Sequence, residues 1–599
     1  MRNRTIKIIE DRVERDFLPF VRKPSRYIGS EVNMIKKDLS SCHLTFALCF
    51  PDIYEVGMSY TGMAVIYDIL NHMPGVAAER AFAPWLDAEQ IMREKNIPLF
   101  TLESKAAAGD FDIIGFSLTT ELCYTTALNM IDLAGLAVRS ADRSQTDPII
   151  IAGGGMTNCC EPVAEFFDIM VLGEAEEAII ELVNLVGSMK DKGASKKDTL
   201  CEVAKCFSWA YVPSLYRFEY NASQIKSFSP IAEDLPERFE NAVVQDFDNA
   251  HVPLRPIVPY AQTVHDRVSV EIMRGCPGRC RFCQAGFCRR PVRHRSVQKI
   301  LEIAKAGFHA TGFDTLSLLS LSTADYPDLE ELVFKLREYF EPKYVGISLP
   351  SLRVDQQLKL LPGLVNSVRK SGLTIAVEAA SEKLRQVINK PLTDENLFAA
   401  VNAAYQAGWQ KIKLYFMVGF PGETENDITR IVDLSHKLAA LRKEVDGKFG
   451  QINVAVSWLV PKAHTPFGFL SQKSGDYFEN ARQLIINRKK MLRAWFLSFK
   501  FHTVKQSILE SAIGRGDRRM GDIIHAAWKK GAKFDLWTEC FDYSIWKQAF
   551  ADYNADPDLL AQQGFTEDQI LPWQHLGGPN KEALIRHLDS ALAFADARS

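Results

Sequence analysis

The sequence predicts an α/β protein that consists of a doubly wound parallel sheet, a partial (βα)6 barrel and a helical carboxyl-terminal region. Two series of short apolar runs predict the parallel strands, because each run is followed by a helix-compatible segment of roughly 10 to 20 residues. Three closely spaced cysteines directly after the first run of the second series indicate where the chemistry takes place. With 599 residues, 47% apolar and 24% charged, the chain has the composition of a globular protein of several domains.

The formal net charge of −3 indicates that any affinity for nucleic acid or membranes must come from a local patch. Charged residues occur throughout the first twenty positions, which therefore lack the apolar stretch of a signal peptide. No run reaches the 18 or so apolar residues of a membrane span. We expect a cytoplasmic protein with no membrane partner.

Residues 1–40 are charged and punctuated by prolines, and we expect an extension that wraps on the next unit. The first sheet is expected within residues 41–185, and its predicted strands lie at 44–50, 112–118, 148–155 and 168–176. Ligands of doubly wound sheets bind outside the carboxyl ends of the strands. The loops at 51–57, 117–121 and 153–158 are therefore the expected cofactor loops.

Residues 186–255 are expected to be a connecting region, in which 186–200 lacks the apolar periodicity of a buried helix and is predicted to be an exposed linker. The second series occupies residues 256–470, with predicted strands at 268–273, 314–320, 344–350, 374–380, 411–420 and 452–460. Six βα units predict a partial, TIM-like barrel with its reactive groups at the carboxyl ends of the strands. Residues 471–599 are helical and rich in tryptophan, and we expect them to pack on the barrel or cover its mouth.

Cys276, Cys280 and Cys283 form a C-x3-C-x2-C pattern in a loop that is rich in glycine and proline. Four cysteines normally saturate a [4Fe-4S] cluster, so three leave one iron free to bind another molecule. Zinc is an alternative, although it prefers four ligands, of which Cys288 is the candidate fourth. Buried cysteines without a metal are a second alternative. The spacing favours the cluster.

The C-x3-C-x-aromatic-C pattern, with Phe282 as the aromatic residue, resembles the signature of radical S-adenosylmethionine (SAM) enzymes. The resemblance implies that SAM chelates the free iron and that the reduced cluster cleaves SAM to a 5′-deoxyadenosyl radical. It also implies an electron donor such as flavodoxin or ferredoxin. No further catalytic residue is assigned.

Later segments resemble the SAM-binding elements of that superfamily. Ser320 and Ser322 stand where relatives often have a glycine-rich turn, and Glu378 with Ser381 resembles the E-x-x-S pattern of the fourth strand. Gly419-Phe-Pro421-Gly-Glu is similar to the turn that passes near the adenine. Residues 461–467 resemble the P-K-x-x-T-P turn of relatives that modify large substrates.

The loop after the first strand resembles the D-x-H-x-x-G motif of cobalamin (B12)-binding domains, with Asp52, Tyr54 and Gly57 at its three fixed positions. Tyr54 replaces the histidine, so this residue cannot supply an imidazole ligand to cobalt. Ser117, Gly153 and Gly154 fit the two later cobalamin loops, where small residues let a nucleotide tail pass close to the sheet. The alternative is a Rossmann-like domain that binds no cobalamin. The whole order resembles a bacterial family of fused cobalamin-type and radical SAM domains.

The leading hypothesis is a radical SAM enzyme that modifies an unidentified substrate, with cobalamin-dependent methylation as one form. Cobalamin-free modification of RNA or protein, on a methylthiotransferase-like barrel, is an alternative. Methylthiotransferases need three more amino-terminal cysteines, and the spacing of Cys42, Cys49, Cys123, Cys159 and Cys160 does not supply them. A non-catalytic iron-sulfur or zinc module is the third reading. The basic, aromatic segment 482–505 indicates either an RNA contact or an amphipathic helix with a solvated basic face.

Overall fold

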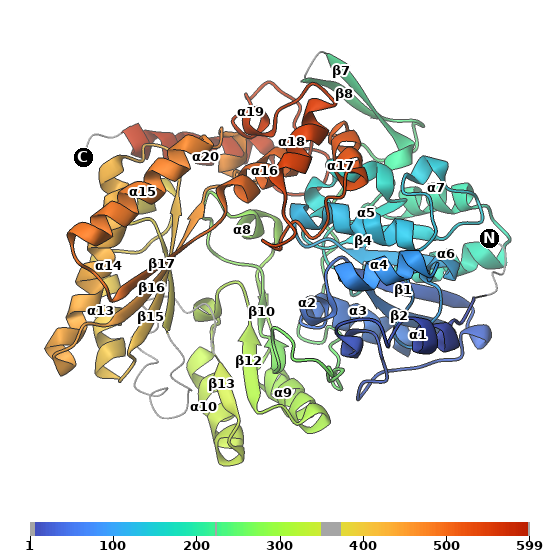
Figure 1. Cartoon of the computed structure of the whole chain (residues 1–599), viewed down its shortest axis with the longest axis horizontal. Helices are drawn as coiled ribbons and strands as arrows, with labels where there is room; N and C mark the ends of the chain where they lie inside the picture. Colours follow the sequence, from blue (N-terminus) through green and yellow to red (C-terminus); the bar gives the residue numbers. More distant parts are fainter. Residues whose placement is uncertain (1–5, 222–223, 349–372, 597–599) are drawn as a thin grey trace.

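The computed structural model describes residues 6–221, 224–348 and 373–596. It confirms the predicted α/β class: two units with parallel sheets lie on either side of a set of carboxyl-terminal helices that contact both (Figure 1). No helix within these ranges is both long and apolar enough to cross a membrane.

The first unit is a six-stranded sheet with strand order β2-β1-β3-β4-β5-β6. Its strands are β1 (Leu44–Phe50), β2 (Val76–Phe82), β3 (Ile113–Ser117), β4 (Ile149–Gly153), β5 (Ile169–Val171) and β6 (Ala210–Tyr211). The first five are parallel and β6 is antiparallel to β5. The strand order reverses between β1 and β3, which is where doubly wound sheets bind ligands.

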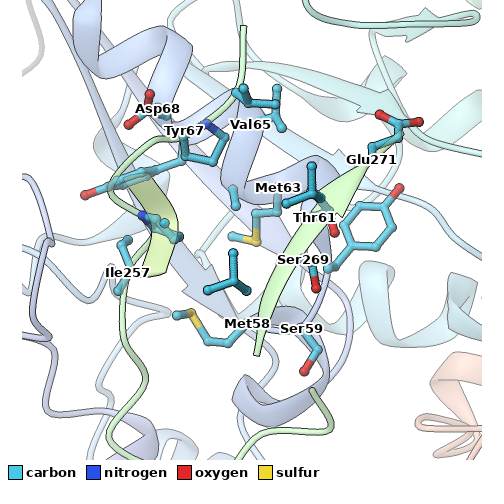
Figure 2. A pocket seen from close by; sticks show the side chains of 18 of the residues that line it. Met58, Ser59, Thr61, Met63, Val65, Tyr67, Asp68, Ile257, Ser269 and Glu271 are labelled. Atoms are coloured by element: carbon cyan, nitrogen blue, oxygen red, sulfur yellow. The ribbon is translucent and has the colours of Figure 1, made fainter. Parts of the chain in front are cut away.

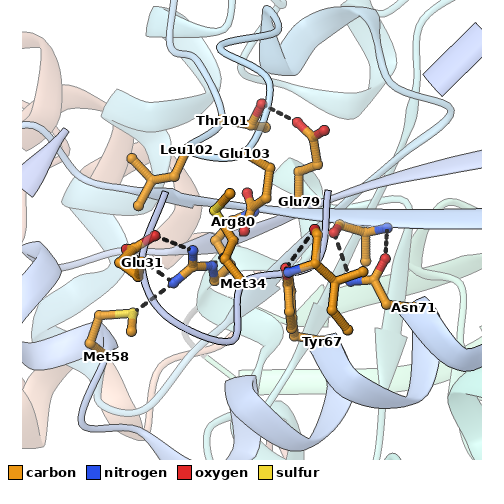
Figure 3. Close-up of polar contacts among 12 residues, drawn as sticks. Glu31, Met34, Met58, Tyr67, Asn71, Glu79, Arg80, Thr101, Leu102 and Glu103 are labelled. Atoms are coloured by element: carbon orange, nitrogen blue, oxygen red, sulfur yellow. Dashed lines mark hydrogen bonds and ion pairs between the residues drawn. The ribbon is translucent and has the colours of Figure 1, made fainter. Parts of the chain in front are cut away.

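Strand β2 was not predicted, because Glu79 and Arg80 interrupt its apolar pattern. Both residues are nevertheless 2% exposed. Figure 3 shows how the charge is compensated: Arg80 contacts Glu31 at 2.9 Å and Glu103 at 2.6 Å. Glu31 belongs to the amino-terminal extension, so this buried ion pair fixes the extension to the sheet.

The helices of the first unit are α1 (Glu10–Asp16), α2 (Tyr54–Gly57), α3 (Thr61–His72), α4 (Leu86–Glu94), α5 (Tyr124–Leu133), α6 (Ala178–Asp191) and α7 (Lys196–Cys206). The exposed linker expected at 186–200 is not found, since α6 and α7 occupy most of it. A capping box between Ser195 and Asp198 starts α7, and Leu200 and Val203 bury one face of it. Helix α7 has few apolar residues, so the sequence pattern did not predict it.

The second unit contains two parallel sheets. One has the order β13-β12-β9 and the other the order β14-β15-β16-β17. The strands are β9 (Val268–Glu271), β12 (Thr315–Leu319), β13 (Gly346–Ser348), β14 (Leu373–Glu378), β15 (Lys411–Val418), β16 (Gln451–Trp458) and β17 (Leu497–Phe501). Each of the six predicted barrel strands is present, although the one expected at 344–350 is described only to Ser348. Strand β17 is an unpredicted seventh.

Among the described residues, β13 and β14 are not paired, so the two sheets form the two sides of an open barrel. The residues between them, 349–372, lie outside the described part. Helices α9 (Val297–Thr311), α10 (Leu329–Phe340), α12 (Glu382–Val387), α13 (Asp394–Gln406) and α14 (Glu425–Asp446) follow the strands. Two short hairpins, β7 (Tyr216–Asn221) with β8 (Gln224–Pro230) and β10 (Met273–Arg274) with β11 (Arg293–His294), complete the strands.

The carboxyl-terminal helices connect the two units (Figure 1). They are α15 (Gly475–Met491), α16 (Val504–Gly514), α17 (Met520–Lys529), α18 (Tyr543–Ala551), α19 (Pro557–Ala561) and α20 (Lys581–Asp596). In α17 the N-cap residue is Arg519, and its neighbour Arg518 pairs with Glu161 of the first unit at 2.9 Å. The basic segment 482–505 is divided between α15 and β17, and Trp495 between them is 80% exposed.

Replacing Arg80 with methionine should destabilise the first unit strongly, because Glu31 and Glu103 would remain buried without a counter-charge. Removing one partner of such a buried pair costs about 3–5 kcal/mol. Urea unfolding followed by circular dichroism measures the effect. Arg15→Met is the control, since Arg15 pairs with Asp16 at the exposed surface and its loss should leave the unfolding midpoint unchanged. Equal midpoints for the two variants would show that the buried network does not hold the extension.

Candidate active site

The three clustered cysteines lie in a loop that leaves the β10 strand and enters the short helix α8 (Gln284–Cys288). Gly275 opens the loop with a φ of +84°, and a Cβ at this position would lie 2.8 Å from the carbonyl oxygen of Arg289. Only glycine fits this turn without strain. The loop therefore starts at the carboxyl end of the first barrel strand, where the reactive groups of such barrels lie.

Two arginines hold the cysteine loop in place. The Arg281 guanidinium donates to the carbonyl oxygens of Gln386 and Val387, both at 2.7 Å, and so attaches the loop to α12. Arg290 donates to the carbonyl of Gly286 at 2.9 Å and closes the loop on itself. These contacts fix the backbone around the thiols independently of any bound group.

Each of the three cysteines is half-buried, whereas Cys288 is buried. Within the described residues, the three sulfur atoms are not all within 4.8 Å of one another. A tetrahedral zinc ion with Zn–S bonds of 2.3 Å needs sulfurs about 3.8 Å apart. A cluster binds each thiolate through a different iron and so takes more widely separated sulfurs. The donor set fits a cluster better than a single zinc ion.

Glu378 ends strand β14 beside the cysteines. Its φ is +65°, and the pairing of β14 with β15 shifts register between Ala376 and Glu378. A left-handed conformation at a non-glycine residue next to a bulge is typical of functional sites. The carboxylate pairs with Lys390 at 3.2 Å. Burial raises the pKa of the Cys280 thiol, the charge of Lys390 lowers it, and the charge of Glu378 raises it.

The turn at 419–423 ends the neighbouring strand β15 and packs against the cysteine loop. Phe282 lies 6.3 Å from Phe420, measured between ring centroids. Gly419 has a φ of +116° and donates its N–H to Glu423 at 2.7 Å, while Pro421 is half-buried beside it. Burial raises the pKa of Glu423 to about 7, although Tyr477 also donates to it at 2.8 Å.

The predicted serines make local hydrogen bonds. Ser320 bonds to Thr323 at 2.8 Å, Ser322 donates to Asp325 at 2.7 Å, and Ser381 caps α12 by accepting from the N–H of Leu384. Of these serines, Ser320 faces a cavity. A role for any of them toward SAM stays a prediction.

A cavity of about 500 Å³ lies between the carboxyl edge of the first sheet and the start of the barrel. Ser117, Gly153 and Gly154 line it from the sheet, and Ser320 and Gly275 line it from the barrel. Its apolar lining includes Phe46, Leu48, Ile151, Val171 and Met273. A Cβ built on Gly153 meets no atom within 4 Å, so this position opens directly into the cavity. The structure thus brings three of the predicted cobalamin residues and one predicted SAM residue, Ser320, to one space, whereas the other predicted SAM residues do not line it.

The first predicted cobalamin loop does not reach this cavity. Tyr54 is 1% exposed and its hydroxyl donates to Glu31 at 3.0 Å. Asp52 accepts from the Trp537 indole at 2.9 Å, and a Cβ on Gly57 would lie 2.3 Å from the Phe82 ring. Tyr54 and Asp52 thus hold the extension and the tail against the sheet, and Gly57 lets the loop pack closely on Phe82 of the sheet.

Charged residues at the cavity were not identified from the sequence. Arg274, three residues after the end of β9, pairs with Glu271 at 2.7 Å and with Glu176 at 2.6 Å. These carboxylates raise the pKa of Arg274 against the opposing effect of burial. In the sequence, these residues are recognisable only as charges at the end of a strand. That pattern does not reveal that Glu176 of the first unit lies opposite Arg274.

The turn at 461–467 is a junction of three parts of the molecule. Lys462 pairs with Glu121 of the first unit at 2.7 Å and with Glu510 of α16 at 2.5 Å. His464 is 2% exposed and lies 2.8 Å from the carbonyl of Asn158. Burial lowers the pKa of His464 to about 4, so its imidazole is neutral at pH 7.

Stability should fall as the pH rises from 4.5 to 8 through the ionisation of Glu423. The pKa of Glu423 is about 7 in the folded chain, above its ordinary value of 4.5, so the folded state binds the extra proton in this window. The difference corresponds to about 3 kcal/mol. Glu423→Gln keeps a neutral group, and urea unfolding at several pH values should show a flatter profile for this variant. If the free energy of unfolding changed with pH in the same way in both proteins, Glu423 would not be the group that titrates.

Comparison with known proteins identifies two domains. Residues 62–213 match the family described as radical SAM proteins, N-terminal, and residues 270–435 match the radical SAM superfamily. The protein MJ0966 of Methanocaldococcus jannaschii is 27% identical over 84% of this chain and 97% of its own length. RimO of Desulfotalea psychrophila, a ribosomal protein uS12 methylthiotransferase, is 30% identical over 30% of this chain and 42% of its own length.

Two solved structures are similar at 13% identity. TsrM from Kitasatospora setae, a radical SAM methyltransferase with cobalamin and a [4Fe-4S] cluster bound, matches 71% of this chain and 77% of its own with a TM-score of 0.47. The cobalamin-dependent radical SAM enzyme OxsB, with aqua-cobalamin and SAM bound, matches 92% of this chain and 78% of its own, also with a TM-score of 0.47. On the two matched domains, the chain belongs to the radical SAM superfamily of enzymes.

Proposed function

We propose that this protein is a radical SAM enzyme in which Cys276, Cys280 and Cys283 hold a [4Fe-4S] cluster and SAM occupies the open iron. The observation that carries the proposal is the position of the half-buried cysteine loop, pinned by Arg281 and Arg290 at the carboxyl edge of the open barrel. When reduced by a donor such as ferredoxin or flavodoxin, the cluster supplies the electron that cleaves SAM to methionine and a 5′-deoxyadenosyl radical.

The chain's own residues would bind and orient SAM around this loop. Glu378 and Lys390 provide a charged pair beside Cys280, suited to the polar groups of the ribose or of the amino-acid part of SAM. Gly419 and Pro421 present backbone at the end of the neighbouring strand, where an adenine would lie. Phe282 and Phe420 pack near each other behind the loop and give this side of the site an apolar wall.

The cavity between the two units is proposed to receive cobalamin, whose bound form would supply a methyl group or an electron to the reaction. Ser117, Gly153 and Gly154 offer small, half-buried positions that line the cavity at the sheet edge, and Gly153 leaves open space beside it for a bulky cofactor. The hydroxyl of Tyr54 is bonded to Glu31, so cobalt would receive no ligand from this loop.

A methylthiotransferase-like function is supported by the likeness to RimO, of which this chain covers less than half. Such enzymes need a second cluster in the amino-terminal domain. Cys49, Cys123, Cys159 and Cys160 are all buried in the first unit, in contrast to the half-buried triplet. We therefore prefer modification by a single cluster, with an RNA or protein substrate among the candidates. A non-catalytic iron-sulfur module would bind iron without cleaving SAM.

Alanine at Cys276, Cys280 or Cys283 should abolish cluster assembly, because each thiolate binds one iron of the cluster. Iron content and absorption spectra after anaerobic reconstitution measure this, and SAM with dithionite tests for 5′-deoxyadenosine and methionine. Cys288→Ala is the matched control and should retain about four irons. Normal iron content in Cys280→Ala would refute the ligand assignment. A full cluster that never cleaves SAM, even with candidate substrates, would favour the non-catalytic module.

Leucine at Gly153 should block cobalamin without disturbing the fold, because its side chain would extend into open space in the cavity. The wild-type protein should retain the corrin absorption band after incubation with hydroxocobalamin and gel filtration. Gly153→Leu should lose the band, whereas its cluster and its thermal unfolding should be unchanged. A wild-type protein that retains no corrin would refute the cobalamin part of the proposal and leave the cluster assignment standing.

A further inference from the structure

Two histidines and an aspartate meet where α3 of the first unit faces the connector that leads to the barrel, apart from the cysteine loop. Asp68 and His72 lie one turn apart on α3, and His251 lies on the connector that leads to β9. Among the residues that the structure describes, these form the single group of three or more His, Cys, Asp or Glu side chains whose ligand atoms all lie within 4.8 Å of one another.

The distances are close to those of a metal site. The Nε2 atom of His251 lies 2.6 Å from the Asp68 carboxylate, and the Nδ1 atom of His72 lies 3.4 Å from it. A tetrahedral ion with metal–nitrogen and metal–oxygen bonds near 2.0–2.1 Å holds its ligand atoms about 3.3 Å apart. The His251–Asp68 contact would have to open by less than about 1 Å, and the His72–Asp68 carboxylate distance already fits. The His72 Nδ1 atom also lies 2.8 Å from the backbone carbonyl oxygen of Asp68, and the metal would replace this hydrogen bond.

The carboxylate of this group is mostly buried, whereas its two imidazoles are accessible to solvent. The Asp68 side chain is 13% exposed, whereas those of His251 and His72 are 37% and 65% exposed. All three line a cavity of about 600 Å³, in which Asn33 and Asn249 add polar groups. An ion could therefore enter from solvent and keep a water molecule at its remaining position.

The residues select a class of metal. Imidazole with one carboxylate suits zinc and its neighbours cobalt, nickel and copper, while magnesium and calcium prefer oxygen ligands. Arg255 and Lys299 line the same cavity, and their positive charges oppose any cation, so an ion held here needs the coordination bonds of the imidazoles. We propose that Asp68, His72 and His251 bind a divalent transition-metal ion of the zinc class.

This site would join two parts of the molecule. His251 and Asp68 also line a smaller pocket of about 130 Å³ that reaches β9, with Asp68 and Glu271 on opposite sides of it (Figure 2). Tyr60, Thr61 and Arg274 line both that pocket and the cofactor cavity. A bound ion would fix the connector to α3 at the outer end of this series of cavities. The inference is independent of the proposed radical chemistry.

The test uses the full-length, cluster-reconstituted protein, so that the cluster occupies the three cysteines. Zinc binding is measured by competition with a chromogenic chelator. The wild-type protein should bind one more zinc ion than His251→Ala or His72→Ala, or bind it at least about tenfold more tightly. His43→Ala is the matched control, because His43 is also exposed and lies 3.6 Å from Asp191 without a second histidine.

Zinc should also raise the thermal unfolding temperature of the wild-type protein and of His43→Ala, but not that of His251→Ala. Asp68→Asn, which keeps the shape of the side chain, should weaken zinc binding as well. Equal zinc stoichiometry and affinity in the wild-type protein and in His251→Ala would overturn the proposal. His251 and Asp68 would then form a hydrogen-bonded pair alone.

Discussion

The ion pairs of Arg274 hold the first barrel strand against the first sheet, and the cavity of about 500 Å³ between the two units depends on them. Arg274 lies two residues before Cys276 and contacts Glu176 of the first unit at 2.6 Å. Arg293, on the strand paired with Arg274, contacts Glu174 at 2.5 Å. Half-buried ion pairs contribute little net stability, because desolvation offsets their attraction. Their value here is positional: they set the distance between the cysteine loop and the carboxyl edge of β4 and β5.

The carboxyl-terminal helices make this arrangement rigid from the opposite side. Lys462 contacts one carboxylate from the first unit and one from α16, so the end of the barrel sheet and both neighbours meet at a single ammonium group. Glu161 accepts from Arg518 and lies 3.0 Å from His575, and despite burial these partners lower its pKa to about 2. The tail is therefore a structural bridge between the two units.

The sequence was most informative where one physical rule dominates. Continuous apolar runs such as 44–50 mark strands covered on both faces, and the cysteine triplet lies in a loop at the end of the first barrel strand, as its position in the sequence predicted. Prediction failed where the partner is distant in sequence. Strand β2 was hidden because Arg80 is compensated by Glu31, 49 residues earlier. The charged lining of the cavity was not predicted, because Arg274 pairs with Glu176, which lies 98 residues earlier in the sequence. Local patterns carry no information about such pairs.

Tyr54 illustrates how a motif can be retained as structure while its ligand function is absent. Its hydroxyl donates to Glu31, and Glu31 in turn pairs with Arg80, so the loop belongs to the buried network of Figure 3. Freeing the tyrosine to face the cavity would leave a buried carboxylate with one donor fewer, which is unfavourable. Any cofactor between the two units must therefore be held by the walls of the cavity, that is, by the later glycine loops, the apolar floor around Phe46 and the barrel residues next to the cysteine loop.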